Sequence, residues 1–149
     1  MNPSYKRVEF TKLYNSAVQL VTSGVDTLVV LNNVTTNGLS LSSNLTAGNY
    51  FCTIQYKHVY KIIFYSYGFG NPGSMSNFYL TLYLNGVAVA TTNSRYTAQL
   101  AIRGNYVAEL KPGDQLYLRA LVSGSGTTYI GDAGGYPYTV PSLNIIEII

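Results

Sequence analysis

Charged residues are scarce in this chain. Among its 149 residues, 9 are Lys or Arg and 6 are Asp or Glu, which is 10% of the total, whereas 47% are hydrophobic. This composition excludes an intrinsically disordered chain, and the length suits one domain with a sizeable core. The basic residues are spread out and no nucleic-acid-binding pattern accompanies them, so we expect no nucleic-acid partner.

Cysteine, histidine and tryptophan are also rare. The single cysteine, Cys52, excludes an internal disulfide and a cysteine-based metal site. The single histidine, His58, follows Lys57 in a predicted strand, which favours a structural role over that of a general base. The aspartates are scattered, and some stand at turns that Asp favours for backbone reasons. We therefore expect no enzyme, no metal and no cofactor.

Long apolar runs and amphipathic helical patterns are missing as well. No segment reaches the length of a transmembrane helix, so we expect no membrane insertion. The opening residues, MNPSYKRVEF, lack the apolar region of a signal peptide. We expect the protein at a virion or extracellular surface, reached by lysis, as part of a particle or after removal of a leader.

The clearest feature that is present is a β-hairpin at residues 77–89, NFYLTLYLNGVAV. Its Asn-Gly pair favours a two-residue type I′ turn, in which both central residues have positive φ. The turn predicts that Leu84 lies opposite Val87 and Leu82 opposite Val89. Since a lone hairpin is barely stable, other strands must pack with it.

Similar patterns predict further strands, separated by turns rich in Gly, Pro and Asn. They lie at residues 26–32, 49–55, 59–67, 98–102, 105–110, 115–122 and 142–149. Residues 111–114, KPGD, are typical of a type II turn, with Pro and Gly at its centre. Roughly eight short strands without a helix indicate an all-β sandwich or jelly roll.

The N-terminal residues 1–24 fit this pattern least. We expect them to form an arm or anchor outside a jelly-roll domain of residues 25–149. Two interpretations stay open for this segment: an extra edge strand or loose arm, or an anchor that docks the domain onto a larger particle or capsid platform.

Five blocks in order carry a resemblance to a known family: TLVVLNNVTTN (27–37), GNYFCTIQYKHVYKIIFYSY (48–67), the hairpin with Asn85-Gly86, LKPGDQLYL (110–118) and SLNIIEII (142–149). Together they resemble the C1q/tumour-necrosis-factor (TNF) superfamily, its C1q-like branch in particular. Similar patterns occur in bacterial spore-surface proteins and in phage fibre and capsid-decoration proteins. The resemblance implies an antiparallel jelly-roll β-sandwich that assembles as a homotrimer.

Two predicted strands, 59–67 and 142–149, are apolar on both sides. A strand with one solvated face should alternate, so a second partner must cover these strands. In the resembling family, such strands line the threefold axis. The predicted trimer interface comprises Tyr60, Ile63, Tyr65, Tyr67, Ile146 and Ile148.

Residues 123–141 form the longest segment without strand character, and its tyrosines on a Gly/Ser background are typical of binding loops. The predicted binding residues are Tyr129, Asp132, Tyr136 and Tyr138, with Phe69 from the loop at 68–76. A disordered insertion is the alternative. Some C1q-like trimers bind calcium through carboxylates, but here only Asp132 lies in a comparable loop, so we predict no metal.

These observations favour a non-enzymatic, trimeric structural or adhesion module displayed on a particle surface. The predicted roles are a virion head fibre, a capsid-decoration protein or a receptor-binding protein, with a host-surface glycan or receptor as partner. The alternatives are a lectin-like carbohydrate-binding module and a secreted C1q/TNF-like ligand.

Overall fold

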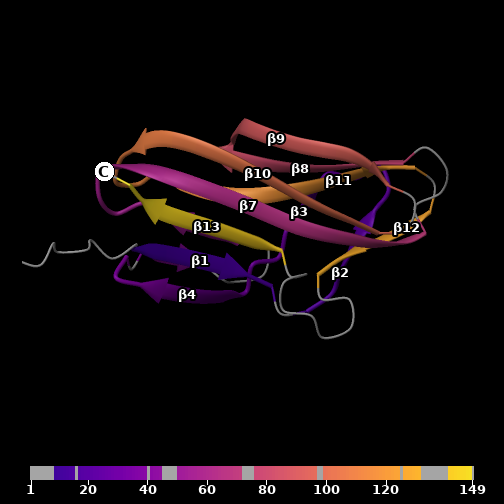
Figure 1. Cartoon of the computed structure of the whole chain (residues 1–149), viewed down its shortest axis with the longest axis horizontal. Coiled ribbons are helices and arrows are strands. Elements are labelled where there is room, and N and C mark those ends of the chain that lie inside the picture. The colour runs from indigo at the N-terminus through magenta and orange to yellow at the C-terminus, as the bar shows by residue number, and fades with distance from the viewer. Residues whose placement is uncertain are drawn as a thin grey trace, which may run out of the picture.

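Two antiparallel β-sheets lie face to face in the computed structural model (Figure 1). It describes residues 9–15, 17–39, 41–44, 50–71, 76–96, 99–124, 126–131 and 141–148. None of these ranges contains a helix, and hence none contains a helix that could cross a membrane. We call the seven-stranded sheet A and the six-stranded sheet B.

Sheet A is organised around its long central strand. Its strand order is β2 (Gln19–Thr22), β12 (Thr127–Ile130), β7 (His58–Asn71), β13 (Ser142–Glu147), β1 (Phe10–Tyr14) and β4 (Asn33–Asn37), and β10 (Gln99–Leu110) also pairs with β7. β13 pairs with residues 60–65 of β7, and β12 pairs with residues 68–71. β10 pairs with β7 from residue 58 to residue 69. Four other strands, β4, β10, β12 and β13, therefore pair along β7 and β1.

Sheet B contains the predicted hairpin. Its strand order is β5 (Ser42–Asn44), β6 (Phe51–Thr53), β11 (Gln115–Ser123), β8 (Ser76–Leu84) and β9 (Val87–Tyr96), and β3 (Thr27–Leu28) also pairs with β11. The turn of the β8–β9 hairpin has positive φ at Asn85 (52°) and Gly86 (83°), as a type I′ turn requires. Leu84 pairs with Val87 as predicted.

The rest of the predicted hairpin register is wrong. Leu82 lies opposite Ala90, not Val89, because the register shifts between Leu82 and Tyr83. An extra residue in one strand moves every later pair by one position. The Asn-Gly turn determines only the first pair, and the bulge arises where β9 follows the twist of the sheet.

The core lies between the two sheets and follows the period of two expected for strands. Phe78, Leu80 and Leu82 of β8 are completely buried, as are Leu116 and Leu118 of β11. The strand predicted at residues 115–122 is confirmed, and its side chains are alternately buried. Burial of such side chains contributes about 1.5–3 kcal/mol each and is the main stabilisation of the sandwich.

β10 is one continuous strand, whereas the sequence predicted two strands with a break at Arg103-Gly104. Gly104 lies opposite Phe64 in β7. A Cβ at Gly104 would lie 2.2 Å from Cζ of the Phe64 ring. Glycine therefore stands here to admit an aromatic ring from the next strand, not to form a turn.

The N-terminal segment is part of the sandwich, and the predicted boundary at residue 24 is wrong for residues 10–22. β1 lies between β13 and β4, and β2 pairs with β12. Leu13 and Val21 are completely buried in the common core. These residues were assigned to an arm because the two strands are short, and pairing with the distant β13 and β12 is what orders them. Residues 1–8 lie outside the described residues.

The segment 123–141 also differs from the prediction of a loop without strand character. Residues 127–130 form β12, paired with both β2 and β7. Likewise, residues 68–71 of the predicted loop 68–76 continue β7. Residues 68–71, GFGN, lack the β-branched composition of a typical strand, and their pairing with β12 keeps them extended. Residues 127–130, TTYI, do have a strand-like composition, but the run is only four residues long and lies in a Gly-rich segment.

Candidate interface on the outer face of sheet A

The outer face of sheet A is apolar where a solvated sheet face is usually polar. In β7, the residues at even positions from 60 to 68 are buried, so the odd positions point away from the core. The outward set is half-buried in a single chain and includes Ile63, Tyr65, Tyr67 and Phe69. An antiparallel sheet that faced water on this side would carry polar residues at these positions.

The apolar face continues across the neighbouring strands. Ile146 of β13 lies opposite Phe10 of β1, and both side chains are half-buried. Asn144 lies opposite Ile63 of β7. Since paired residues project on the same side of a sheet, the face extends over at least β1, β13 and β7.

A row of stacked rings covers the part of this face near β12. The rings of Tyr67 and Phe69 lie 6.2 Å apart at 30°. Phe69 pairs with Tyr129 in β12, and their rings lie 5.7 Å apart at 28°. Tyr129 is 37% exposed, and its neighbour Leu20 in β2 is 53% exposed. These are offset-stacked pairs, a favoured geometry for aromatic side chains.

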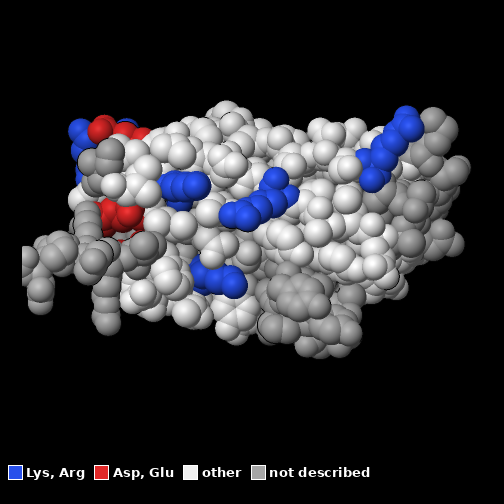
Figure 2. Space-filling model, in the orientation of Figure 1, with Lys and Arg blue, Asp and Glu red and all other residues white. Residues whose placement is uncertain are grey.

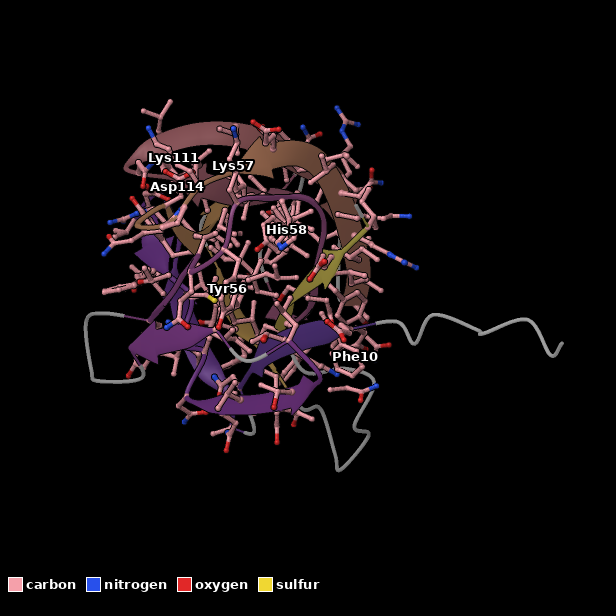
Figure 3. All side chains as sticks on the ribbon, turned by 90° about the vertical axis from the view of Figure 1, so that its left-hand side faces the viewer. Phe10, Tyr56, Lys57, His58, Lys111 and Asp114 are labelled. Carbon is pink, nitrogen blue, oxygen red and sulfur yellow. The ribbon has the colours of Figure 1, made fainter. Side chains whose placement is uncertain are left out.

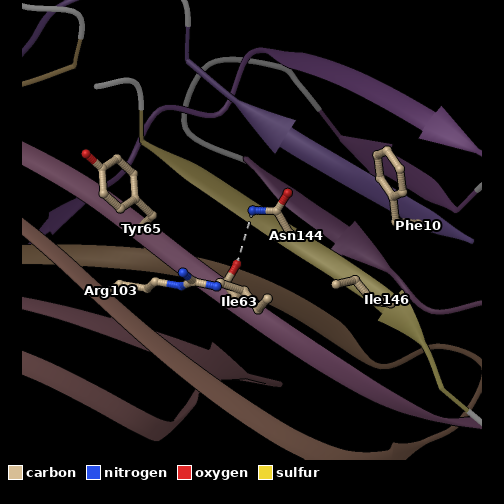
Figure 4. Close-up of a pocket in the computed structure, with 6 residues that line it drawn as sticks. All are labelled: Phe10, Ile63, Tyr65, Arg103, Asn144 and Ile146. Atoms are coloured by element: carbon tan, nitrogen blue, oxygen red, sulfur yellow. Dashed lines mark hydrogen bonds between the residues drawn. The ribbon is translucent and has the colours of Figure 1, made fainter. Parts of the chain in front are cut away.

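A shallow pocket of about 350 Å³ lies on the same face, at the other end of the row (Figure 4). It is lined by Phe10, Ile63, Tyr65, Arg103, Asn144 and Ile146. The Asn144 amide donates hydrogen bonds to the Ile63 carbonyl (3.4 Å) and to the Ser142 hydroxyl (3.3 Å), which fixes the side chain on the floor of the pocket. The polar groups of the lining side chains are this amide, the Arg103 guanidinium and the Tyr65 hydroxyl, and the other lining side chains are apolar.

Figure 2 shows the same face: basic side chains are set singly into its central part, and the acidic side chains in this view lie at the left-hand end. The basic residues of the outer face are Lys12 in β1, Lys61 in β7 and Arg103 in β10. The Lys12 ammonium lies 5.6 Å from the centre of the Tyr14 ring. Among the described residues, none of these three cations forms an ion pair with a carboxylate.

By sequence, the chain matches no protein-family model and no curated protein. By structure, it matches the globular domain of zebrafish complement 1qA protein, with a TM-score of 0.62 and 13% identity, over 95% of this chain and 97% of that one. It also matches Eiger TNF from S. frugiperda, with a TM-score of 0.62 and 9% identity, over 96% of this chain and 94% of that one. Murine APRIL at pH 8.0 matches with a TM-score of 0.63 and 11% identity, over 95% of this chain and all 100% of that one.

The fold is a C1q/TNF-like jelly roll. The predicted resemblance and the predicted all-β jelly-roll class are therefore confirmed. The similarity to the zebrafish complement 1qA globular domain spans 95% of this chain.

In this C1q/TNF-like jelly roll, most predicted interface residues lie on one face. Ile63, Tyr65, Tyr67 and Ile146 share the outer face of sheet A, and Ile148 follows the end of β13 with 43% exposure. Their role in a trimer stays a prediction.

Tyr60 is the exception, and its assignment to an interface is corrected. Its side chain is completely buried in the core, and its hydroxyl donates a hydrogen bond of 2.7 Å to the Tyr56 carbonyl. Tyr60 and Tyr65 are an odd number of positions apart in one strand, so they point to opposite faces. Burial, with a further contribution from the Glu147 carboxylate, raises the pKa of Tyr60 to about 12.

Two predicted binding residues, Phe69 and Tyr129, also lie on the outer face of sheet A, where their rings stack on each other and Phe69 also stacks on Tyr67. The structure thus joins residues that the sequence had assigned to two separate sites. Asp132, Tyr136 and Tyr138 lie outside the described residues. The predicted site residues did not include Phe10, although its alternation with polar neighbours indicates a short strand.

A second aromatic cluster lies on the outer face of sheet B. The Tyr83 and Tyr117 rings are stacked at 5.2 Å and 11°, and the Arg119 guanidinium lies 5.9 Å from the first and 6.0 Å from the second. Arg119 also pairs with Asp26 at 3.6 Å. Arg119 therefore forms an ion pair, whereas Lys12, Lys61 and Arg103 on sheet A form none with the described carboxylates.

The end of the sandwich in Figure 3 carries most of the remaining ionisable groups. His58 Nδ1 lies 3.5 Å from Glu147 Oε1, and Lys57 pairs with Glu109 at 3.4 Å. Within the described ranges, no three His, Cys, Asp or Glu side chains gather as metal ligands would. Burial raises the pKa of the Cys52 thiol to about 12, so this cysteine is protonated at neutral pH.

Proposed function

We propose that this chain is a non-enzymatic structural or adhesion module that assembles as a homotrimer through the outer face of sheet A. The observation that supports this proposal is the apolar and aromatic character of a sheet face whose opposite side is already buried in the core. Contiguous apolar surface of this kind marks interaction sites on soluble proteins. The expectation of three copies comes from the resemblance to C1q-like domains.

The energetics favour association. A large apolar side chain contributes about 1.5–3 kcal/mol on full burial, and half-buried residues retain roughly half of that gain for an assembly. Stacked aromatic pairs add about 0.5–1.5 kcal/mol when water is excluded from them. The rings of Tyr67, Phe69 and Tyr129 are already stacked, so little side-chain entropy is lost when a second copy covers them.

Light scattering on the purified chain tests the assembly. We expect a mass of about three times 16.3 kDa. Tyr67→Lys should dissociate the trimer, because it places three like charges in one apolar interface at a cost of several kcal/mol. Tyr79→Lys is the matched control, since Tyr79 is a half-buried outward residue on β8 of sheet B. A monomer at micromolar concentration, or equal effects of both variants, would contradict the proposal.

The finer role that we propose is display on the surface of a particle, such as a virion, where the trimer attaches or adheres. The low share of charged residues, 10%, supports a chain whose surface is largely covered by other subunits. Co-sedimentation of the wild-type chain with particles, compared with Tyr67→Lys, tests this role. A trimer that never accompanies particles would instead favour a secreted ligand or a lectin-like module.

A further inference from the structure

The three basic residues of the outer face surround one pocket. Lys12, Lys61 and Arg103 come from three different strands, and each is the cross-strand neighbour of a residue that lines the pocket. Lys12 lies opposite Asn144, Lys61 lies opposite Ile146, and Arg103 lies opposite Tyr65. Of the three cations, Arg103 lines the pocket itself. Cβ atoms of directly opposed residues are about 4.5–5.5 Å apart, so the flexible Lys12 and Lys61 side chains are long enough to turn towards a ligand in it.

The chain has few carboxylates to neutralise these cations. Three described carboxylates are engaged elsewhere, in the pairs Lys57–Glu109, His58–Glu147 and Arg119–Asp26. The Asp114 carboxylate accepts hydrogen bonds from the Asn85 amide and the Lys111 N–H. Glu9, the remaining described carboxylate, precedes Phe10 at the start of β1 and forms no ion pair with a described cation. The whole chain has a net charge of +3, so an assembly of identical copies cannot balance its own charge.

We infer that the pocket between β1, β13, β7 and β10 binds a small multivalent oxyanion of the phosphate or sulfate class. The inference rests on the proposed trimer, because association through this face would enclose the three cations of every copy. Enclosed like charges destabilise an interface unless a counter-charge enters with them. A multivalent oxyanion would offset this cost.

The chemistry of the pocket suits such a ligand. The planar guanidinium of Arg103 can bind two oxygens of one oxyanion, while Lys12 and Lys61 act as point charges. Phe10, Ile63 and Ile146 line the pocket with apolar atoms. Exclusion of water by these side chains in an assembly would strengthen each charge–charge interaction.

The test uses the full chain and inorganic phosphate at constant ionic strength, with chloride as the balancing anion. Isothermal titration calorimetry measures phosphate binding, and sedimentation measures the trimer–monomer equilibrium. In the wild-type chain we expect phosphate, but not chloride, to bind and to shift the equilibrium towards trimer. Arg103→Gln combined with Lys61→Gln should weaken phosphate binding by about tenfold or more, since most of the ligand's charge partners are lost.

Two control variants separate charge from site. Arg95→Gln removes one exposed cation from β9 of sheet B and should change phosphate affinity by less than about twofold. Arg103→Lys keeps the charge and should retain part of the response. In buffer without multivalent anions, Arg103→Gln should stabilise the trimer, because it removes repulsion between copies. The alternative is that carboxylates of a neighbouring copy neutralise Arg103, in which case Arg103→Gln would destabilise the trimer. The direction of the change in trimer stability therefore distinguishes a bound anion from such carboxylates.

The outcomes also separate this inference from the proposed function. A trimer that responds equally to phosphate and chloride, or that is destabilised by Arg103→Gln in anion-free buffer, would overturn the oxyanion site and leave the trimer standing. A monomer that binds phosphate only when Arg103 and Lys61 are intact would support the site and refute the trimer. Equal losses in Arg95→Gln and in the double variant would mean non-specific charge screening and refute the site.

Discussion

Asp114 connects three turns at one end of the sandwich, and its replacement should destabilise the whole fold. Its Oδ1 accepts a hydrogen bond of 2.8 Å from the Asn85 amide in the β8–β9 turn, and its Oδ2 accepts one of 3.0 Å from the Lys111 N–H. Its backbone carbonyl accepts a hydrogen bond of 2.8 Å from the N–H of Ile54, which follows β6. The Asn85 side chain in turn accepts from the N–H of Gln115 at 2.9 Å.

The expected magnitude follows from these contacts. Asp114 is only 7% exposed, and Asp114→Ala would leave two donors without their charged acceptor. Hydrogen bonds to charged groups contribute about 1.5–3 kcal/mol each, and partners at the surface place both at the low end. We expect a loss of about 2–3 kcal/mol, or roughly 5–10 °C in the melting temperature for a chain of this size.

The same carboxylate makes stability depend on pH. Burial alone would raise the pKa of Asp114, but the hydrogen bonds from Lys111 and Asn85 and the Lys111 charge outweigh it and lower the pKa. A lowered pKa in the folded state means that the contribution is fully present above the unfolded-state pKa of about 3.9. It is lost as the pH falls from there through the folded-state pKa. Asp114→Asn should flatten this part of the stability profile.

Urea denaturation at fixed protein concentration, followed by circular dichroism at pH 7 and between pH 5 and pH 2, measures both effects. Asp26→Asn is the matched control, because its side chain is 49% exposed and an exposed ion pair is worth about 0–1 kcal/mol. If Asp114→Ala costs no more than Asp26→Asn, the proposed connection of the three turns is refuted.

Two further predictions concern the core. Gly104→Ala should cost about 1–3 kcal/mol in urea denaturation, because its Cβ would overlap the Phe64 ring. Gly68→Ala in β7 should be tolerated, since its Cβ would meet Phe78 at an ordinary 3.5 Å, and equal losses would contradict this reasoning. Cys52 should resist alkylation at pH 8 until the chain is unfolded in urea, because burial keeps its thiol protonated; rapid labelling of the folded chain, measured by mass spectrometry, would refute its burial.

Part of the candidate interface could be predicted from the sequence, because the side-chain pattern that indicates it lies within single strands. The double apolar character of residues 59–67 and 142–149 identified Ile63, Tyr65 and Ile146 as residues that a second partner should cover. Side-chain direction within a strand follows a period of two, so position alone separates the two faces. The same period places Tyr60 on the opposite face from Ile63 and Tyr65, so the predicted interface combined residues of both faces. The sequence could not indicate which of these two faces the core takes.

The local elements were determined by the sequence itself. The Asn-Gly turn, the Pro-Gly turn at residues 111–114 and the alternation of β11 depend on neighbouring residues, whose φ preferences and spacing are visible in the chain. The tertiary structure decided how distant segments pair. β1 lies between β13 and β4, and the Phe64 ring of β7 packs against Gly104 of β10. Strand pairing also places Phe69, Tyr129 and Arg103 on one face of sheet A. These outcomes depend on hydrogen bonds and packing between residues far apart in sequence, which no local pattern encodes.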